Sequence, residues 1–368
     1  MQRRILLLIK GLGRGGAEQL LASSAVHTDR ARFEYEVAYL LPNKSAVASE
    51  LRGADIVVHC LDGASGVAWI GRLRSLVRRR RIDMIHAHSP VAAVGARLAF
   101  DGRGPRQVYT EHNVWDRYHP ITYWANALTF PRSDHVFAVS DHVRESIRYP
   151  RGLRALRMPS VETLYHGIDP GSIEGWTSVD GVREELGIPA GAPVVGTVAN
   201  FKRHKRLDVL LRAADRVRRE VPEVRFVMVG QGPLEAETRR LARDLGLERT
   251  VLFTGFRDDA PRVASAFDVF AISSEFEGLS IAVIEALALG KPVVVTDVGG
   301  LPEVVEDGRQ GFVVPARDPA SLAERIVRLL GDPLERQRMG EAGRARAATF
   351  DIRRSVARIE RVYEELLA

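Results

Sequence analysis

Hydrophobic and polar positions along the chain follow two alternating patterns. Short apolar runs such as Val269–Ile272 and Val293–Val295 are typical of strands that are buried on both faces of a parallel sheet. Between such runs lie stretches in which apolar residues recur at helical spacing, for example Leu207–Arg218. Strands that alternate with helices predict an α/β fold with parallel sheets.

This alternation starts twice along the chain. A first strand is predicted at Arg4–Ile9 and a second start at Val194–Val198, and 368 residues suffice for two domains of roughly 150 residues each. We therefore expect an N-terminal domain, a C-terminal domain and a final amphipathic helix, over residues 1–170, 171–350 and 351–368 respectively.

One strand–loop–helix–strand unit, residues 269–295, is predicted to bind a ligand. Its loop, Glu277–Ser280, follows a strand and leads directly into a helix, which ends at Gly290 before Pro292. Ligands of open α/β sheets bind at the carboxyl ends of the strands. The free N–H groups of a helix N-terminus favour a phosphate at that place.

A second carboxylate of this unit, Glu285, interrupts an otherwise apolar helix, IAVIEALAL. A buried carboxylate needs hydrogen-bond partners, and the hydroxyl groups of a ribose would supply them. The alternative is that Glu285 points to solvent from an amphipathic helix. The residues of the helix alone leave both interpretations open.

The spacing of the two carboxylates resembles a known signature. Glu277, seven residues and Glu285, followed by GKPVVVTDVGGLPEVVEDGRQGFVV, are similar to the signature of the retaining glycosyltransferases of family 4. The resemblance implies a GT-B architecture, in which two Rossmann-like domains face each other across a cleft. It also implies a nucleotide-sugar donor bound mainly by the second domain, with neither a metal nor a cofactor.

A basic loop, ANFKRHKR, follows the strand Val194–Val198 and resembles the family motif G-R-L-x-x-x-K-G. Positive charge at a strand–helix junction favours a phosphate. Lys205 matches the family lysine, which neutralises the leaving diphosphate, whereas Asn200 stands where the family has arginine. We expect Lys202 or Arg203 to supply the second cation; an exposed loop without a ligand is the alternative.

The resemblance assigns further roles in donor binding. Glu277 would hydrogen-bond the sugar, and Glu285 the ribose. The amides of the loop would contact the diphosphate or the sugar, and the end of the strand that begins at Val251 would hold the base. These last two groups are Gly278, Leu279 and Ser280 for the amides, and Phe256 and Arg257 for the base.

A glycine-rich turn follows the first strand. Gly11, Gly13 and Gly16 match G-x-G-x-x-G, but the next predicted strand, Tyr35–Leu41, ends without the acidic residue that a dinucleotide-binding site needs. The resemblance instead implies that this loop faces the donor, with Gly13, Gly15 and Gly16 as its contacts. We prefer this interpretation to NAD binding.

Histidines follow two further strands of the first half. His86 and His88 share one side of a strand and could form a metal pair, but no third ligand is evident nearby, so no metal site is predicted. By resemblance, His88 lines the acceptor side and His112 reaches the donor sugar. Glu111, on the acceptor side, is the weaker candidate beside His112.

Charge is distributed unevenly. The net charge is +6; residues 1–170 hold 24 Lys/Arg and 16 Asp/Glu, whereas residues 171–368 hold 29 Lys/Arg and 31 Asp/Glu. A basic first half suits an anionic surface, and the arginine-rich helix Ile70–Arg81 suggests phospholipid headgroups. A solvated surface helix is the alternative. Nucleic acid is not expected, because no aromatic residues interleave with a basic platform.

Other features suggest the compartment. The single cysteine, Cys60, excludes an internal disulfide and is expected to be packed in the core. No apolar run approaches the roughly 18 residues of a membrane-spanning helix. The basic N-terminus precedes only a five-residue apolar run, which we interpret as a strand and not as a signal peptide. We expect a cytoplasmic protein, with peripheral attachment to the inner face of the membrane as a variant.

Together these features predict a retaining glycosyltransferase. It would move a sugar from a UDP-sugar, or next from GDP-mannose, to a hydroxyl of a glycan or lipid-linked acceptor, in envelope or exopolysaccharide synthesis. A GT-B epimerase or hydrolase of nucleotide sugars is one alternative. A non-catalytic nucleotide-binding protein is another, but the presence of Glu277, Glu285 and Lys205 together argues against it.

Overall fold

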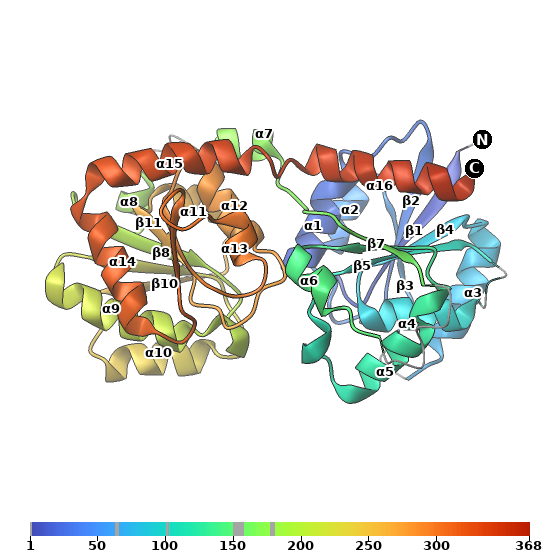
Figure 1. Ribbon diagram of the computed structural model, residues 1–368, viewed down its shortest axis with the longest axis horizontal. Helices are drawn as coiled ribbons and strands as arrows, with labels where there is room; N and C mark the ends of the chain where they lie inside the picture. Colours follow the sequence, from blue (N-terminus) through green and yellow to red (C-terminus); the bar gives the residue numbers. More distant parts are fainter. Residues whose placement is uncertain (1, 63–65, 101, 103, 150–157, 177–180) are drawn as a thin grey trace. The chain divides into compact units, whose positions relative to one another are not determined.

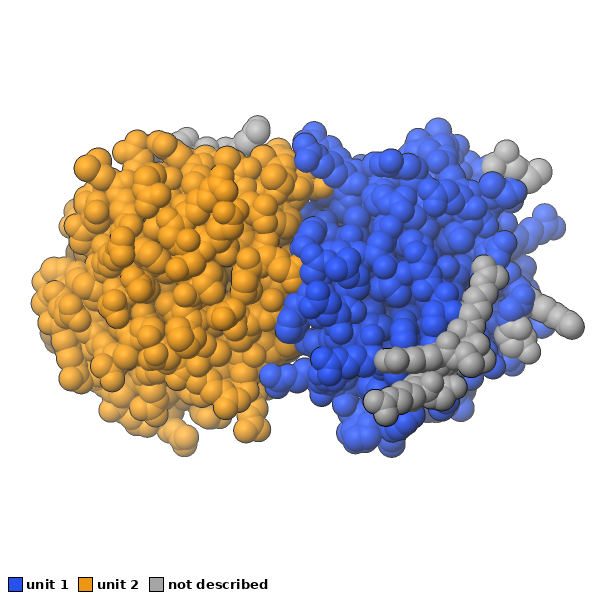
Figure 2. All heavy atoms as spheres, viewed as in Figure 1, with its two compact units in different colours: residues 1–167, 352–368 blue, residues 168–351 orange. Residues whose placement is uncertain are grey.

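The computed structural model describes residues 2–62, 66–100, 102, 104–149, 158–176 and 181–368. The chain forms two compact units. Unit 1 contains residues 1–167 and 352–368, and unit 2 contains residues 168–351 (Figure 2). Each unit is built around one parallel sheet with helices on both of its faces (Figure 1).

The sheet of unit 1 has seven parallel strands in the order β3-β2-β1-β4-β5-β6-β7. The chain crosses from β1 to β2 and β3 on one side and then returns to β4 beside β1, which is the doubly wound arrangement. The strands are β1 (Arg3–Ile9), β2 (Phe33–Tyr39), β3 (Val57–Cys60), β4 (Met84–Ala87), β5 (Arg106–Glu111), β6 (His135–Ala138) and β7 (Ser160–Thr163).

Alternate residues of these strands serve two separate hydrophobic cores. On β1, Leu6 and Leu8 pack with α3, α4 and α5, whereas Ile5 and Leu7 pack with α1, α2 and α16. This follows from the period of two along a strand. The helices of unit 1 are α1 (Gly16–Ala25), α2 (Ala48–Gly53), α3 (Trp69–Arg80), α4 (Pro90–Ala99), α5 (Pro120–Thr129), α6 (Asp141–Ser146) and α16 (Ile352–Leu367), with short 3-10 helices at η2 (Trp115–Arg117) and η3 (Phe130–Arg132).

The sheet of unit 2 has six parallel strands in the order β10-β9-β8-β11-β12-β13. These are β8 (Val194–Val198), β9 (Arg225–Val229), β10 (Val251–Gly255), β11 (Val269–Ala271), β12 (Val293–Thr296) and β13 (Gly311–Val314). The helices are α7 (Pro170–Glu174), α8 (Val182–Glu185), α9 (Leu207–Glu220), α10 (Glu235–Asp244), α11 (Ala260–Ser265), α12 (Ile281–Ala288), α13 (Leu301–Val304), α14 (Pro319–Gly331) and α15 (Pro333–Ala347), with a 3-10 turn at η5 (Arg203–Lys205).

The strand order of unit 2 places its ligand-binding edge. β8 and β11 are adjacent, although β9 and β10 lie between them in the sequence, so the order reverses between these two strands. The loops that leave β8 and β11 in opposite directions therefore meet at the carboxyl edge of the sheet. A crevice at such a reversal is the usual ligand site of doubly wound sheets.

One expectation from the sequence is wrong. Cys60 is exposed, because it lies at the end of β3, and β3 is the edge strand of its sheet. An edge strand at the border of a sheet is covered less completely than a central one. A strand of four residues is too short for its sequence pattern to show which side is buried.

Candidate active site

Two loops meet at the carboxyl edge of unit 2. One joins β8 to α9, and the other joins β11 to α12. The Ser273 hydroxyl donates to the carbonyl oxygens of Lys205 and Arg206 at 3.0 and 2.9 Å, and the Glu275 amide donates to the His204 carbonyl at 2.7 Å. These bonds fix each loop against the other.

The contact between the two loops includes two predicted site residues. The Lys205 ammonium group lies 2.5 Å from a carboxylate oxygen of Glu277, and the Ser274 hydroxyl donates to the same oxygen at 2.6 Å. Glu277 is buried and Lys205 is largely buried. A lysine and a glutamate that are far apart in the sequence thus form one charged group at the strand ends, where a phosphate and a sugar could be held together.

Glycines make room for this arrangement. Gly299 has φ = +57°, and a Cβ there would lie 1.7 Å from the Glu277 carbonyl oxygen. The Gly300 amide donates to that same carbonyl. Gly230 has φ = +130°, and a Cβ added there would lie 2.0 Å from the Ala199 carbonyl oxygen. Glycine is therefore required at both positions for the loops to pack closely, because any side chain there would displace the backbone.

Glu285 lies on α12 and is partly buried. Desolvation raises the pKa of its carboxyl group to about 7. Among the described residues, its carboxylate makes no hydrogen bond or ion pair. A carboxylate in this setting gains from any donor that reaches it.

The loop Gly278–Ser280 leads into the first turn of α12. Ser280 occupies the N-cap position and is buried, but its side chain does not accept a hydrogen bond from the helix. The amides of the first turn are thus not capped by the side chain that usually serves this purpose. The predicted anion-binding amides lie at the same strand end as Lys205 and Glu277.

The loop before Lys205 holds Asn200 and the two candidates for the second cation, Lys202 and Arg203. The Asn200 carbonyl accepts the Lys202 amide at 2.7 Å, which folds the loop back on itself. The side chains of Lys202 and Arg203 are exposed, and within the described parts of the chain neither enters an ion pair. Both charges can therefore reach a ligand without first leaving a protein partner.

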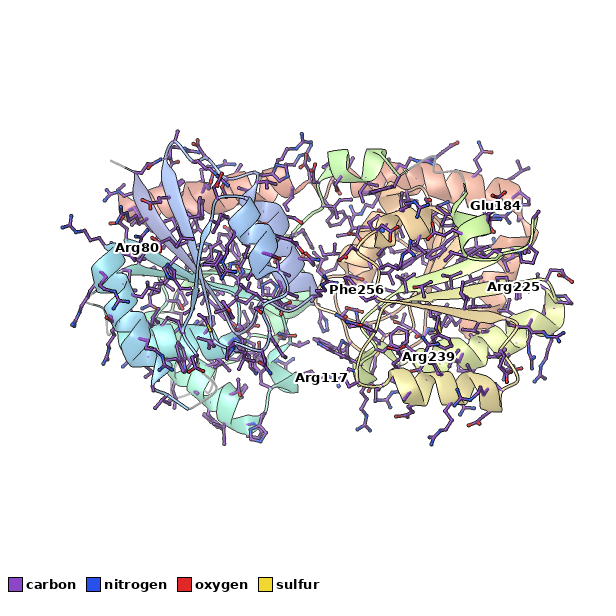
Figure 3. The ribbon with its side chains drawn as sticks, turned by 180° about the vertical axis from the view of Figure 1, so that it is seen from behind. Arg80, Arg117, Glu184, Arg225, Arg239 and Phe256 are labelled. Atoms are coloured by element: carbon purple, nitrogen blue, oxygen red, sulfur yellow. The ribbon has the colours of Figure 1, made fainter. Side chains whose placement is uncertain are left out.

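The two predicted base contacts follow β10. Phe256 is partly exposed there (labelled in Figure 3). The Arg257 guanidinium is engaged with Asp259 at 2.7 and 2.8 Å and with Glu185 at 2.7 Å. These carboxylates raise the pKa of Arg257. The arginine is thereby held in place by acidic neighbours.

Unit 1 gathers four histidines near the carboxyl edge of its own sheet. The rings of His86 and His88 stack with centroids 4.3 Å apart, His88 and His112 are 5.7 Å apart, and His112 stacks on His166 at 5.8 Å. We call this set the histidine row. It combines residues from β4 and from the loops that follow β4, β5 and β7. His166 was not among the sequence candidates; its signal was its position shortly after a strand, as for His112.

Burial keeps the histidine row neutral. Desolvation lowers the pKa of His112 to about 4, and desolvation together with the neighbouring His112 lowers that of His166 to about 3. The pKa values of His86 and His88 are lowered well below the usual value for the same reasons. A neutral imidazole can donate or accept a hydrogen bond with a sugar hydroxyl, but it is a poor source of positive charge.

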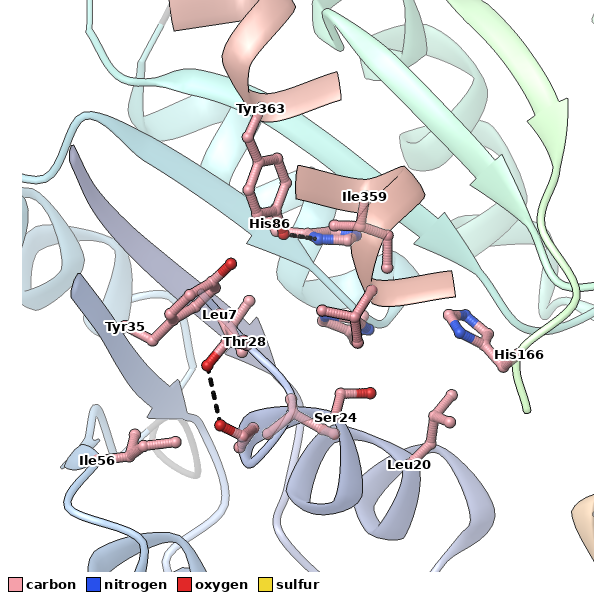
Figure 4. A pocket seen from close by; sticks show the side chains of 14 residues that line it. Leu7, Leu20, Ser24, Thr28, Tyr35, Ile56, His86, His166, Ile359 and Tyr363 are labelled. Carbon is pink, nitrogen blue, oxygen red and sulfur yellow. Dashed lines mark hydrogen bonds between the residues drawn. The ribbon is translucent and has the colours of Figure 1, made fainter. Parts of the chain in front are cut away.

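An apolar pocket adjoins this row and is lined on one side by residues of α16 (Figure 4). His86 is fixed at its base, because its two nitrogens contact the Tyr363 hydroxyl and, at 2.7 Å, the Thr110 hydroxyl. The pocket has a volume of about 40 Å³, and its lining includes His86, His88 and His166 of the histidine row. Helix α16 thus helps to fix the position of the histidine row through the contact of Tyr363 with His86.

Glu111 lies in the interior of unit 1. Its carboxylate accepts hydrogen bonds from the side chains of Tyr109 and Trp115 at 2.8 and 2.9 Å, from the Tyr118 hydroxyl and from the Asn113 amide. Glu111 is completely buried. In this position the carboxylate shapes the loop after His112, since all of its donors belong to β5 and to that loop.

The glycine-rich turn of unit 1 leads into α1. Gly15 is the N-cap of the helix, and a Cβ there would meet the Glu18 carboxylate at 2.2 Å. Gly13 and Gly16 have open space where a Cβ would lie. Their lack of side chains leaves the backbone of this turn accessible. Among the described residues, no group of three or more His, Cys, Asp or Glu side chains could hold a metal ion.

Comparison with known proteins identifies the family of both units. Residues 3–172 match the model of Glycosyltransferase Family 4, and residues 179–346 match that of Glycosyl transferases group 1. The alpha-maltose-1-phosphate synthase of Mycolicibacterium smegmatis is 30% identical over 353 residues, which is 82% of this chain and 88% of that protein. The chain belongs to glycosyltransferase family 4.

Other relatives agree with this assignment. The N-acetyl-alpha-D-glucosaminyl L-malate synthase of Bacillus anthracis is 27% identical over 82% of this chain and 79% of its own length. Anabaena HepE, solved in complex with UDP and glucose, superposes with a TM-score of 0.86 at 23% identity, covering 99% of this chain and 100% of that one. The chain is a glycosyltransferase with the GT-B fold.

Proposed function

We propose that this glycosyltransferase takes its sugar from a nucleotide diphosphate donor, preferably a UDP-sugar and next GDP-mannose. The observation that carries the proposal is the contact of Lys205 with Glu277, which holds one cation and one carboxylate at the reversal point of the strand order of unit 2. HepE, a protein of the same fold, has been solved with UDP and with UDP-glucose. These complexes support UDP as the first nucleotide to test.

Different residues of unit 2 would bind different parts of the donor. Lys205 and the first-turn amides of α12 would stabilise the diphosphate, on which negative charge develops as its bond to the anomeric carbon breaks. Glu277 would hydrogen-bond the hydroxyls of the sugar, since its second carboxylate oxygen accepts none of the bonds described above. Glu285 would accept from the ribose hydroxyls, which would relieve its desolvated carboxylate.

We infer that the sugar keeps its anomeric configuration and passes to a hydroxyl of a glycan or a lipid-linked saccharide. The bond from the anomeric carbon to the diphosphate breaks, and a bond from that carbon to the acceptor oxygen forms on the same face. The acceptor proton passes to an oxygen of the leaving diphosphate. His112, neutral because its pKa is lowered to about 4, would act as a hydrogen-bonding group and not as an acid.

The nucleotide is tested by the melting temperature of the purified protein with UDP, GDP, ADP and NAD. A ligand at about 100 times its dissociation constant adds roughly 2.7 kcal/mol, or several degrees for a domain of this size. We expect a shift with UDP or GDP that Glu285→Gln reduces. A shift with NAD alone would overturn the proposal and would indicate that the glycine-rich turn of unit 1 binds a dinucleotide.

Donor turnover then separates the enzyme from the alternatives. Glu277→Ala should retain part of the nucleotide-induced shift but lose transfer to an acceptor by about two to three orders of magnitude. If the variant still fulfils the role of the protein in the cell, the protein acts by binding a nucleotide and not by catalysis. Release of free sugar at the same rate with and without acceptor would indicate a hydrolase, and conversion of the donor into its epimer would indicate an epimerase.

A further inference from the structure

Helices α4 and α5 of unit 1 expose apolar side chains to solvent. Of the nine large hydrophobic side chains that are exposed among the described residues, five belong to these two helices. They are Val91 (36% exposed), Leu98 (47%), Ile121 (74%), Trp124 (51%) and Leu128 (57%). Such a concentration on neighbouring helices marks an interaction surface, whereas single exposed hydrophobic residues need no explanation.

The spacing of these residues shows that each helix has one outward apolar face. Ile121, Trp124 and Leu128 recur at i, i+3 and i+7 on α5. On α4 the same spacing joins Val91 and Leu98 through the half-buried Val94. The opposite faces of both helices are buried against the sheet. A helix that is apolar on all sides is expected to be covered on all sides. We call the outward faces of α4 and α5 the apolar face.

The surroundings of the apolar face are basic. Residues 66–82, 84–100 and 117–133, which include α3, α4 and α5, contain no Asp or Glu. The Arg74 guanidinium on α3 donates to the carbonyl oxygens of Ala99 and Leu98 at 2.9 and 3.2 Å, so a cation lies directly beside the apolar face. Arg78, one turn later on α3, and Arg132, just beyond the end of α5, are also exposed.

We propose that the apolar face docks on a lipid bilayer that contains anionic headgroups. Ile121, Trp124 and Leu128 would enter the boundary between headgroups and acyl chains, where tryptophan is especially stable, and the arginines would contact lipid phosphates. Helices α3, α4 and α5 form one layer on the face of the sheet opposite α16, so all of these groups belong to one side of unit 1 (Figure 1).

The charge around the apolar face favours a bilayer over a second copy of the chain. A symmetric dimer would place the same surface on both subunits, and the arginines of one copy would then meet those of the other. Helix α3 itself cannot supply the apolar contact, because Trp69, Leu73 and Leu76 are buried in the core of unit 1. The arginine-rich helix thus contributes charge, and α4 and α5 contribute hydrophobic surface.

Sedimentation with vesicles tests the proposal without donor or acceptor, and therefore independently of sugar transfer. Wild-type protein should bind vesicles of phosphatidylcholine with phosphatidylglycerol at low salt, and more weakly vesicles of phosphatidylcholine alone. The triple variant Ile121→Ser, Trp124→Ser and Leu128→Ser should lose affinity by about tenfold or more. Replacement of Arg78 and Arg132 by Gln should remove much of the salt-sensitive part of the binding.

The matched control replaces exposed apolar residues elsewhere, with Val26→Ser, Val57→Ser and Leu334→Ser, and should bind as wild type. Three results would overturn the proposal. The first is no vesicle binding by the wild type at low salt. The second is a wild-type dimer in analytical ultracentrifugation that the triple variant dissociates, since a second copy would then cover the apolar face. The third is a lower melting temperature of the triple variant, which would mean that the chain itself covers it.

Discussion

The carboxyl edges of the two sheets differ in their chemistry although the sheets share one architecture. In unit 1 the histidine row is neutral, because burial lowers the pKa of His112 to about 4 and that of His166 to about 3. In unit 2 the edge carries opposite charges in contact, above all Lys205 and Glu277. One doubly wound sheet thus presents uncharged hydrogen-bonding rings, and the other presents fixed charges.

The two edges suit different chemical groups of a glycosyl transfer. A diphosphate requires cations and oriented amides, which unit 2 has in its strand-end loops. A sugar hydroxyl is recognised by neutral donors and acceptors, which imidazoles supply without the cost of removing a charge from water. We infer that the histidine row serves hydroxyl groups and that the charged edge serves the leaving group.

Acid should strongly destabilise unit 1. The unfolded chain binds protons to its histidines below about pH 6.5, whereas the folded His112 and His166 do not until about pH 4 and pH 3. Stability is therefore full above that unfolded value and is lost as the pH falls toward the folded values. At about pH 5 each of the two histidines should lower the free energy of unfolding by about 2 kcal/mol relative to neutral pH. Urea unfolding at about pH 7.5 and pH 5 measures the loss.

His166→Phe isolates the contribution of one ring. A phenyl ring can keep the stacking on His112 but cannot bind a proton, so the variant should recover about 2 kcal/mol at about pH 5 and gain little at about pH 7.5. Urea curves that respond to pH identically in the variant and the wild type would show that the histidine row does not determine the acid sensitivity.

Substitutions at the charged edge of unit 2 should lower the rate of sugar transfer. Lys205→Met and Glu277→Gln should each lower kcat by about 10²–10³. Because the two side chains are in contact, the double variant should lose much less than the product of the single losses. Glu275→Gln, in the same loop but paired with Arg206 and Arg317, is the control and should lose less than about tenfold. Fully additive losses would show that Lys205 and Glu277 act separately.

Much of unit 2 could be predicted from the sequence because its elements are local and strongly patterned. The strand Val194–Val198 was predicted to the residue, and α9 and β12 were predicted to within two residues of their observed ends. The positions of Glu277 and Lys205 followed from the strand–loop–helix pattern and the family motifs. Their direct contact could not be predicted, since it depends on β8 and β11 being neighbours.

Unit 1 was harder to predict for a physical reason. Helix α5 has hydrophobic residues on both its buried and its outward side, so its sequence does not show which side packs on the sheet. The family resemblance implies that Glu111 lies at the acceptor side, yet its side chain turns into the interior, where Tyr109 and Trp115 donate hydrogen bonds to it. Which face of a strand a residue occupies near its end is not determined by spacing alone.

A smaller effect concerns Glu285, the isolated carboxylate of unit 2. Its folded pKa of about 7 lies above its ordinary value near 4.5, so the unfolded chain releases a proton that the folded chain keeps. The carboxylate thus lowers stability progressively as the pH rises from about 4.5 to about 7. Glu285→Gln should raise the free energy of unfolding by about 1–3 kcal/mol at about pH 8, and hardly at about pH 4.5. The same variant should bind UDP more weakly, as calorimetry would show.

Changes at the position where the chain departs from its family should have a still smaller effect. Asn200 occupies the position of the family arginine, and the exposed side chains of Lys202 and Arg203 are the candidates to replace that charge. The one that contacts the diphosphate should, when changed to Gln, raise the KM for the donor by about threefold to tenfold and make that KM less sensitive to salt.

The other side chain then serves as the matched control, because it has the same charge and is likewise exposed in the same loop. Asn200→Arg completes the test: if Lys202 or Arg203 has taken over the missing charge, a third cation should lower the donor KM of the Gln variant more than that of the wild type. If both Gln variants match the wild type, Lys205 and the helix amides of α12 stabilise the diphosphate without a second cation, and the charged edge of unit 2 depends on one lysine.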